Sequence, residues 1–193
     1  MSHRVSEFVF KNRKFIHTTA AVIPIPVKFL LHGTTTLQLW IAGIFLMLLG
    51  ITFRMYTAGY LSGAHTTTSI NANYICTSGP FAYIRNPLYV GNFVIGLSLV
   101  IAFNEWYGYL VFILHYITAY SILIPYEEKF LTDKFGKTFT EYRAHSRRFL
   151  PKLKPFKGGP KVTPDFKLGI LSEKYYFLIL ILLFAILFFL FVK

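Results

Sequence analysis

The sequence holds a single cysteine, Cys76, and only eight acidic residues against twenty basic ones. One cysteine excludes an internal disulfide and offers no thiol spacing suited to a metal. The six histidines are scattered, and none is paired at the four-residue spacing with which a helix binds a metal. We therefore predict no metal site, and we interpret His65, His115 and His145 as structural residues.

A secretory signal is also lacking at the start of the chain. Residues 1–14 are polar and basic, and the apolar segment that follows contains His17, Pro24 and Lys28. No small-residue cleavage site stands out after it, so we expect no cleaved leader.

Apolar residues, by contrast, are abundant and unevenly placed. The chain is 54% hydrophobic and 19% aromatic, with only 15% charged residues. The stretch Tyr175–Val192 runs for eighteen residues without a charge. That length is near the minimum for crossing a hydrocarbon core of about 30 Å. A helix in a soluble domain of this size is rarely apolar on every side, so we predict a membrane span here.

Four further segments are expected to lie in the membrane: residues 15–31, 37–53, 89–104 and 107–124. In the first, Pro24 and Pro26 must break or kink a helix, and Lys28 is expected to extend its ammonium to the interface. The connection at Asn104–Trp106 is so short that the segments on either side must be antiparallel neighbours. We therefore predict a helical hairpin within the membrane.

The charges support one orientation of these segments. If the N-terminus is cytoplasmic, so are residues 54–88 and 125–174, and twelve Lys or Arg residues fall between Lys129 and Lys174. The opposite side then shows little beyond Glu105 and the terminal Lys193, which is the positive-inside pattern. The net charge of +12 thus lies beside apolar spans, so the membrane surface is a better partner than nucleic acid.

The predicted fold is all-α: a polytopic membrane helical bundle of about five spans with a central hairpin, forming one domain over residues 1–193. Residues 54–88 are rich in Gly, Ser, Thr and Asn and are expected to be mostly loop. Residues 125–150 have apolar side chains at helical steps, which predicts interfacial helices lying on the membrane. These side chains, expected to face the membrane, are Phe130, Leu131, Phe135, Phe139 and Tyr142. Residues 152–167 read as a basic linker to the last span.

A first polar cluster precedes the hairpin. Gly79 and Pro80 predict a turn, and Pro87 stands where a helix can begin, with Asn86 as its N-cap. The free N–H groups of a helix start, together with the charge of Arg85, suit a carboxylate or a phosphate.

A second polar cluster, Glu127 and Glu128, follows the hairpin where the fourth segment is expected to leave the bilayer. Adjacent carboxylates beside an apolar span are costly without cationic partners. Because the two segments of the hairpin are antiparallel, these glutamates and Arg85 are expected at the same depth. A site with one cationic and one anionic end suits a zwitterionic amino-acid group.

These motifs resemble those of the isoprenylcysteine carboxyl methyltransferase and phospholipid methyltransferase group of membrane enzymes. The resemblance covers residues 77–151 and includes an Arg-Asn-Pro-x-Tyr motif, the hairpin, and a Glu-Glu pair followed by Phe-Gly, Tyr and Pro. The matching residues are Arg85, Asn86, Pro87, Tyr89, Glu127, Glu128, Phe135, Gly136, Tyr142 and Pro151. In one respect the chain departs from the group: Asn86 stands where the isoprenylcysteine enzymes usually have His, which weighs against their specific substrate.

The resemblance implies S-adenosylmethionine as cofactor, bound under the cytoplasmic loops. Its carboxylate is expected near Arg85, its amino group near Glu127 or Glu128, and its adenine among aromatic side chains. Arg85 and Glu128 are the residues expected to carry the reaction. The full set of expected cofactor-binding residues is Gly79, Tyr83, Arg85, Asn86, Pro87, Tyr89, Glu127 and Glu128.

The implied reaction transfers a methyl group to a lipidic acceptor, either an isoprenylcysteine-like carboxylate or a phospholipid amine. Methyl transfer from a sulfonium is an in-line displacement that needs mainly alignment and desolvation. A carboxylate acceptor needs no general base, whereas an amine must first lose a proton. Two alternatives stay open: a membrane reductase of the sterol-reductase type with a nicotinamide cofactor, and a non-catalytic lipid-binding protein.

Overall fold

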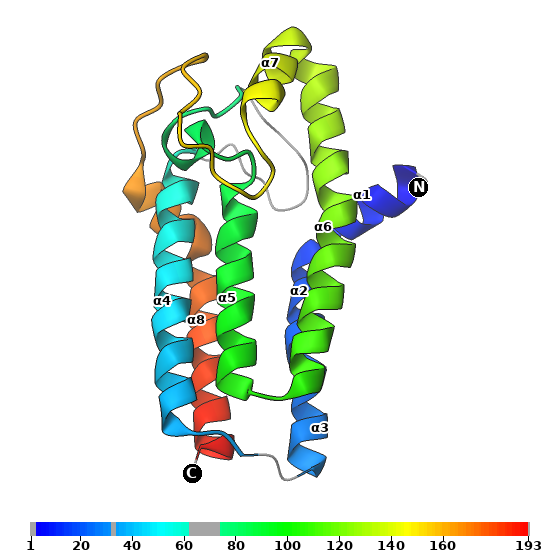
Figure 1. Ribbon diagram of the computed structural model, residues 1–193, viewed down its shortest axis with the longest axis vertical. Coiled ribbons are helices and arrows are strands. Elements are labelled where there is room, and N and C mark those ends of the chain that lie inside the picture. Colours follow the sequence, from blue (N-terminus) through cyan, green and yellow to red (C-terminus); the bar gives the residue numbers. More distant parts are fainter. Residues whose placement is uncertain (1–2, 32–33, 62–73, 193) are drawn as a thin grey trace.

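The computed structural model describes residues 3–31, 34–61 and 74–192, and within them the chain is helical apart from loops and two isolated bridges. Figure 1 shows the long helices side by side as a bundle, with loops, α7 and the short helix η1 gathered at the upper end. The helices are α1 His3–Lys11, α2 Arg13–Val22, α3 Pro24–Leu30, α4 Leu37–Gly59, α5 Pro87–Phe103, α6 Trp106–Phe135, α7 Lys137–His145, α8 Phe166–Phe191 and the 3₁₀ helix η1 Gly79–Ala82. The all-α prediction is confirmed.

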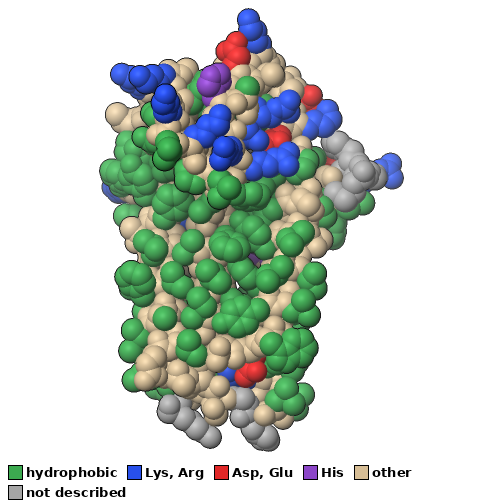
Figure 2. All heavy atoms as spheres, viewed as in Figure 1, with side chains coloured by type: hydrophobic (Ala, Val, Ile, Leu, Met, Phe, Trp, Pro, Cys, Tyr) green, Lys and Arg blue, Asp and Glu red, His purple; other side chains and the backbone are tan. Residues whose placement is uncertain are grey.

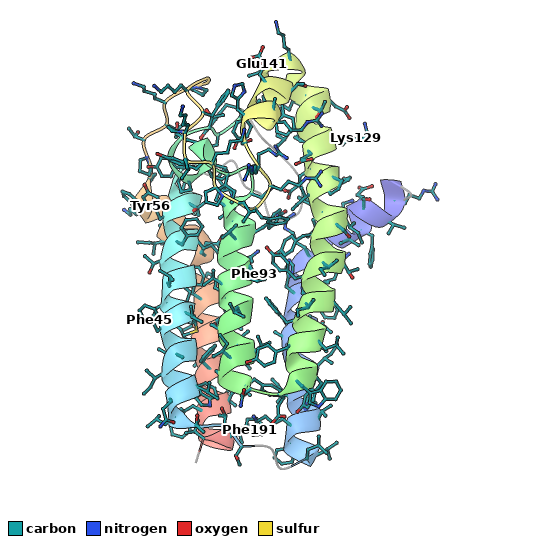
Figure 3. All side chains as sticks on the ribbon, in the orientation of Figure 1. Phe45, Tyr56, Phe93, Lys129, Glu141 and Phe191 are labelled. Carbon is teal, nitrogen blue, oxygen red and sulfur yellow. The ribbon has the colours of Figure 1, made fainter. Side chains whose placement is uncertain are left out.

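Within the described residues, three helices are long and apolar enough to cross a membrane: α4, α6 and the Glu173–Phe191 part of α8. Shorter apolar helices cover Phe15–Leu30 and α5. Hydrophobic side chains coat the sides of the bundle (Figure 2), and Phe45 points away from it with 67% of its surface exposed (Figure 3). An apolar outer surface of this extent suits surrounding lipid better than water.

The tightest packing is among α4, α5 and α8. Their shared core includes Trp40, Met47, Ile95 and Phe184, and the Trp40 and Phe184 rings meet edge to face with centroids 5.3 Å apart. Gly43 lets α4 approach α5 closely, because a Cβ there would lie 2.8 Å from the Cβ of Ala102. Close backbone approach through small residues is a usual basis of helix association in membranes.

Replacing Gly43 with leucine is expected to destabilise the bundle by about 1–3 kcal/mol, because the new side chain overpacks the α4–α5 contact. The matched control is Ala42→Leu, since Ala42 is exposed on the outer face of the same helix. Thermal unfolding in detergent micelles compares the two. Equal midpoints would show that α4 and α5 do not need this close approach.

The central hairpin forms as predicted. Asn104 takes a left-handed conformation with φ 52° and donates its N–H to the Val100 carbonyl at 2.8 Å, which ends α5. The chain then enters α6 at Trp106. α5 begins at Pro87 as expected, but the side chain of Asn86 does not cap it. Instead the Asn86 amide donates to the Arg148 carbonyl at 3.2 Å.

The fourth segment, predicted over residues 107–124, forms most of α6, which continues through Pro125 to Phe135 and rises beyond the start of α5 (Figure 1). α7 then folds back over the top. Phe139 and Tyr142 are 1% and 3% exposed and pack on Ile75. The expectation that these two rings face the membrane is therefore wrong: they form the core of the top of the protein.

The first segment breaks where the prolines predicted. α2 ends at Val22 and α3 begins at Pro24, and both lie along α6. The side chain of Lys28 is completely buried and extends to the hairpin turn at this end of the bundle. Its ammonium lies 3.2 Å from a Glu105 carboxylate oxygen.

Candidate cofactor site

The top of the bundle, which we call the cap, is built from η1, α7 and the segments around them. The chain after α7, residues 146–156, runs along residues 82–85 and is here called the strap. Three backbone bonds join them: Arg85 N–H to Arg147 O at 2.8 Å, Lys152 N–H to Tyr83 O at 3.0 Å, and Phe156 N–H to Ala82 O at 2.8 Å. The strap backbone is therefore fixed on the loop that carries the first polar cluster.

An open cavity of about 630 Å³ lies between the strap, η1 and the upper turns of α4 and α5. Its lining residues are Phe53, Tyr56, Gly79, Pro80, Ala82, Tyr83, Ile84, Val90, Phe149, Pro151 and Pro155. Gly79 has φ +57°, and a Cβ there would lie 2.4 Å from the Tyr60 ring, so only glycine fits. Gly79 and Tyr83, both expected cofactor residues, therefore lie at this cavity.

Beside the cavity, Arg85, Glu128 and Arg148 form an ion cluster. The carboxylate of Glu128 accepts from Arg85 Nε at 3.2 Å and from Arg148 at 3.1 Å (Nε) and 2.7 Å (Nη2). The hairpin argument anticipated contact between Arg85 and Glu128. Neither residue lines the cavity, but Arg85 follows Ile84 and Arg148 precedes Phe149, which both do.

The sequence argument did not identify Arg148 as part of this cluster. It is one of several basic residues in and just after α7, which the sequence argument did not connect with Glu128. Figure 2 shows Lys and Arg side chains gathered over the cap. The path of the strap brings Arg148 to the buried carboxylate of Glu128, and the sequence alone does not reveal that path.

The side chains of Glu127 and Glu128 contact different residues, because successive helical residues point about 100° apart. The Tyr89 hydroxyl donates to Glu127 Oε1 at 2.5 Å. The Tyr89 ring is 9% exposed and packs on the Tyr120 ring with centroids 4.5 Å apart. Glu127 and Tyr89 thus face the space between α5 and α6, away from the cavity.

Phe149 connects these two regions. It lines the cavity, and its ring also lies 6.0 Å from that of Tyr116 and 6.4 Å from that of Tyr120. Phe93 extends from α5 toward α6 (Figure 3) and meets the Tyr116 ring edge-on at 4.7 Å. An aromatic wall therefore runs from the cavity down between the two helices of the hairpin.

A polar network crosses the bundle below the cap. Arg54 of α4 pairs with Glu173 of α8 at 2.8 Å and donates to the side-chain oxygen of Asn92. The Asn92 amide donates to the Tyr120 hydroxyl at 3.0 Å. These contacts join α4, α5, α6 and α8 at one level. The sequence analysis did not predict this network, because isolated polar residues within apolar segments carry no sign of their partners.

Other chemistry-bearing side chains are accounted for by local contacts. His17 and His115, the latter interpreted as lacking a partner, lie with Nδ1 and Nε2 2.7 Å apart between α2 and α6. His65 lies outside the described residues. Burial raises the pKa of the Cys76 thiol to about 11, so it stays protonated at neutral pH. Among the described residues no group of three or more His, Cys, Asp and Glu is placed to hold a metal.

The apolar helices, the hairpin and the polar cap define a multi-pass integral membrane protein with a cofactor-sized cavity at one end. The phospholipid methyltransferase family matches residues 39–138, more than half of the chain, and the protein belongs to that family. The resemblance seen in the sequence is thus confirmed. The matched region contains Arg85, Glu127 and Glu128 and ends before the strap.

A curated relative adds a second finding. Over 165 residues the chain is 28% identical to the cobalt-zinc-cadmium resistance protein CzcN of Cupriavidus metallidurans, covering 82% of this chain and 72% of that protein. No solved structure matches the chain.

Proposed function

We propose that this protein is an S-adenosylmethionine-dependent methyltransferase that acts on a lipidic acceptor, either an isoprenylcysteine-like carboxylate or a phospholipid amine. The observation that carries the proposal is the cavity at the cap, lined by Gly79 and Tyr83 and flanked by the Arg85–Glu128–Arg148 cluster. Family membership supports the same activity.

The residues present fit this cofactor. A volume of about 630 Å³ falls within the usual range of small-molecule sites, roughly 300–1,000 Å³. Tyr56 and Tyr83 offer ring faces to an adenine, and apolar residues supply most of the remaining wall. Both signs of charge stand next to the wall, as a zwitterionic amino-acid end requires.

Bound S-adenosylmethionine would supply a methyl group on a positively charged sulfur. The protein's part is then alignment and exclusion of water, which Phe53, Val90 and Phe149 provide as apolar walls. An amine acceptor must lose a proton before it reacts, whereas a carboxylate acceptor needs no base.

We further propose five membrane spans. Three are α4, α6 and α8, the fourth is α5, and the fifth is formed by α2 and α3 together. The N-terminus and the cap would then be cytoplasmic, in agreement with the basic side chains over the cap (Figure 2). The acceptor would enter from the bilayer, where the apolar sides of the bundle meet lipid.

Isothermal titration of the purified protein with S-adenosylhomocysteine and with NADPH tests the proposal. We expect binding of S-adenosylhomocysteine and no binding of NADPH. Binding of NADPH alone would favour the reductase, and binding of neither would favour a non-catalytic lipid-binding protein. Incubation of membranes with methyl-labelled cofactor, followed by lipid extraction, then identifies the acceptor.

The likeness to CzcN supports a second proposal, that this activity contributes to resistance to heavy metals. Cells sensitive to cobalt, zinc and cadmium, supplied with either the intact chain or the Glu128→Gln variant, provide the test. We expect improved growth only with the intact chain. Equal growth with both would separate any role in resistance from the proposed methyl transfer.

A further inference from the structure

Two guanidinium groups contact the Glu128 carboxylate, and they differ sharply in how they are held. Arg85 is 11% exposed, and its Nη1 also donates to the carbonyls of Arg143, at 2.6 Å, and Ser146. Arg148 is 47% exposed, and it donates to both carboxylate oxygens of Glu128. Arg85 is thus tied into the cap by backbone carbonyls, whereas Arg148 can leave Glu128 by rotating its side chain into solvent.

Both carboxylate oxygens of Glu128 are occupied in this arrangement. Oε1 accepts from Arg85 and Arg148, and Oε2 accepts from Arg148 at 2.7 Å. A carboxylate offers about four acceptor positions and three are taken here, so a ligand ammonium that pairs fully with Glu128 competes with the two guanidinium groups. Displacing Arg85 would leave the carbonyls of Arg143 and Ser146 without their donor, which is costly in a buried place. Displacing Arg148 has no such cost, because it leaves no buried carbonyl without a donor and its guanidinium can be hydrated.

We propose that Arg148 binds the cofactor's carboxylate, and that the amino-acid end of the cofactor inserts into the Glu128–Arg148 ion pair. The ligand ammonium takes the place of Arg148 on Glu128, and the released guanidinium pairs with the ligand carboxylate. One ion pair is opened and two are formed, so the buried carboxylate keeps a cationic partner throughout. This inference rests on the proposed function, and it moves the carboxylate contact from Arg85, where sequence reasoning placed it, to Arg148.

The strap explains how Arg148 can exchange partners without unfolding the cap. Its backbone is held on each side, by the bond from Arg85 N–H to Arg147 O and by the bond from Lys152 N–H to Tyr83 O. The Asn86 amide holds the carbonyl of Arg148 itself. The neighbouring Phe149 lines the cavity, so the guanidinium is attached to the cavity wall while its side chain alone moves.

Titration of the Arg148→Gln variant with two ligands tests the proposal. S-adenosylhomocysteine carries the amino-acid group, whereas methylthioadenosine has the same nucleoside without it. We expect Arg148→Gln to weaken binding of S-adenosylhomocysteine by about tenfold, because the lost pair with the ligand carboxylate outweighs the half-exposed pair with Glu128 that no longer has to open. Methylthioadenosine should bind the variant and the unmodified protein equally. Arg148→Lys should recover part of the lost affinity.

The matched control is Arg147→Gln, which removes the same charge one residue earlier on an exposed side chain and leaves the backbone bond from Arg85 in place. It should bind both ligands as the unmodified protein does. An equal loss for both ligands in Arg148→Gln would mean that Arg148 only shapes the cap, and unchanged affinity for both would also overturn the proposal. If the unmodified protein binds neither ligand, the proposed function itself fails.

Discussion

Replacing Glu128 with glutamine is expected to abolish S-adenosylhomocysteine binding and to lower the free energy of unfolding by about 3–5 kcal/mol. The side chain of Glu128 is 9% exposed, and among the described residues its carboxylate is the one that pairs with Arg85. A neutral amide leaves the positive charge of Arg85 buried without a counter-ion. Unfolding monitored by circular dichroism in micelles measures the stability, and titration below the unfolding transition measures binding.

Asp133→Asn is the matched control for this variant. Asp133 lies on the same helix and pairs with Lys129 at 2.6 Å, but both side chains are more than half exposed. Exposed pairs contribute little to stability, so Asp133→Asn should resemble the unmodified protein in both measurements. If Glu128→Gln also leaves stability and binding unchanged, the ion cluster neither stabilises the cap nor binds the cofactor.

The features that sequence reasoning anticipated were those set by local chain geometry. The two-residue connection of Asn104 and Glu105 leaves α5 and α6 no arrangement but a hairpin, and Asn104 accepts the left-handed conformation that the turn needs. Pro87 marks the start of α5 because a proline fits the first helical turn. Contact between Arg85 and Glu128 then follows, since the hairpin brings its two ends to the same level.

Structural features that depend on residues far apart in the chain could not be predicted in the same way. Pro125 costs α6 a hydrogen bond, yet the helix continues because Glu128, Leu131 and Phe135 beyond it are held in the cap. The helical spacing of Phe139 predicted an apolar face correctly but not what covers that face. Burial under the cap rather than against lipid is decided by the strap and by Ile75, which lies 64 residues earlier (139 − 75).

The second large effect is expected at the other end of the bundle. Lys28 is fully buried, and its ammonium lies 3.2 Å from Glu105, donates to the carbonyls of Phe103 and Thr34, and sits 4.8 Å from the Phe103 ring centre. It joins α3, the hairpin turn and the chain before α4. Lys28→Met should lower the free energy of unfolding by about 3–5 kcal/mol, because it leaves the Glu105 charge and two carbonyls without their donor.

A double variant separates the lost ion pair from the lost packing. Lys28→Met combined with Glu105→Gln removes both charges, and it should recover much of the stability that Lys28→Met loses, since no uncompensated carboxylate is left beside apolar side chains. Lys129→Met, at an exposed lysine of α6, serves as the control for loss of a positive charge. Thermal and denaturant unfolding in micelles compare the four proteins. A double variant no more stable than Lys28→Met would show that the carbonyl contacts of Lys28, and not its pairing with Glu105, hold this end of the bundle together.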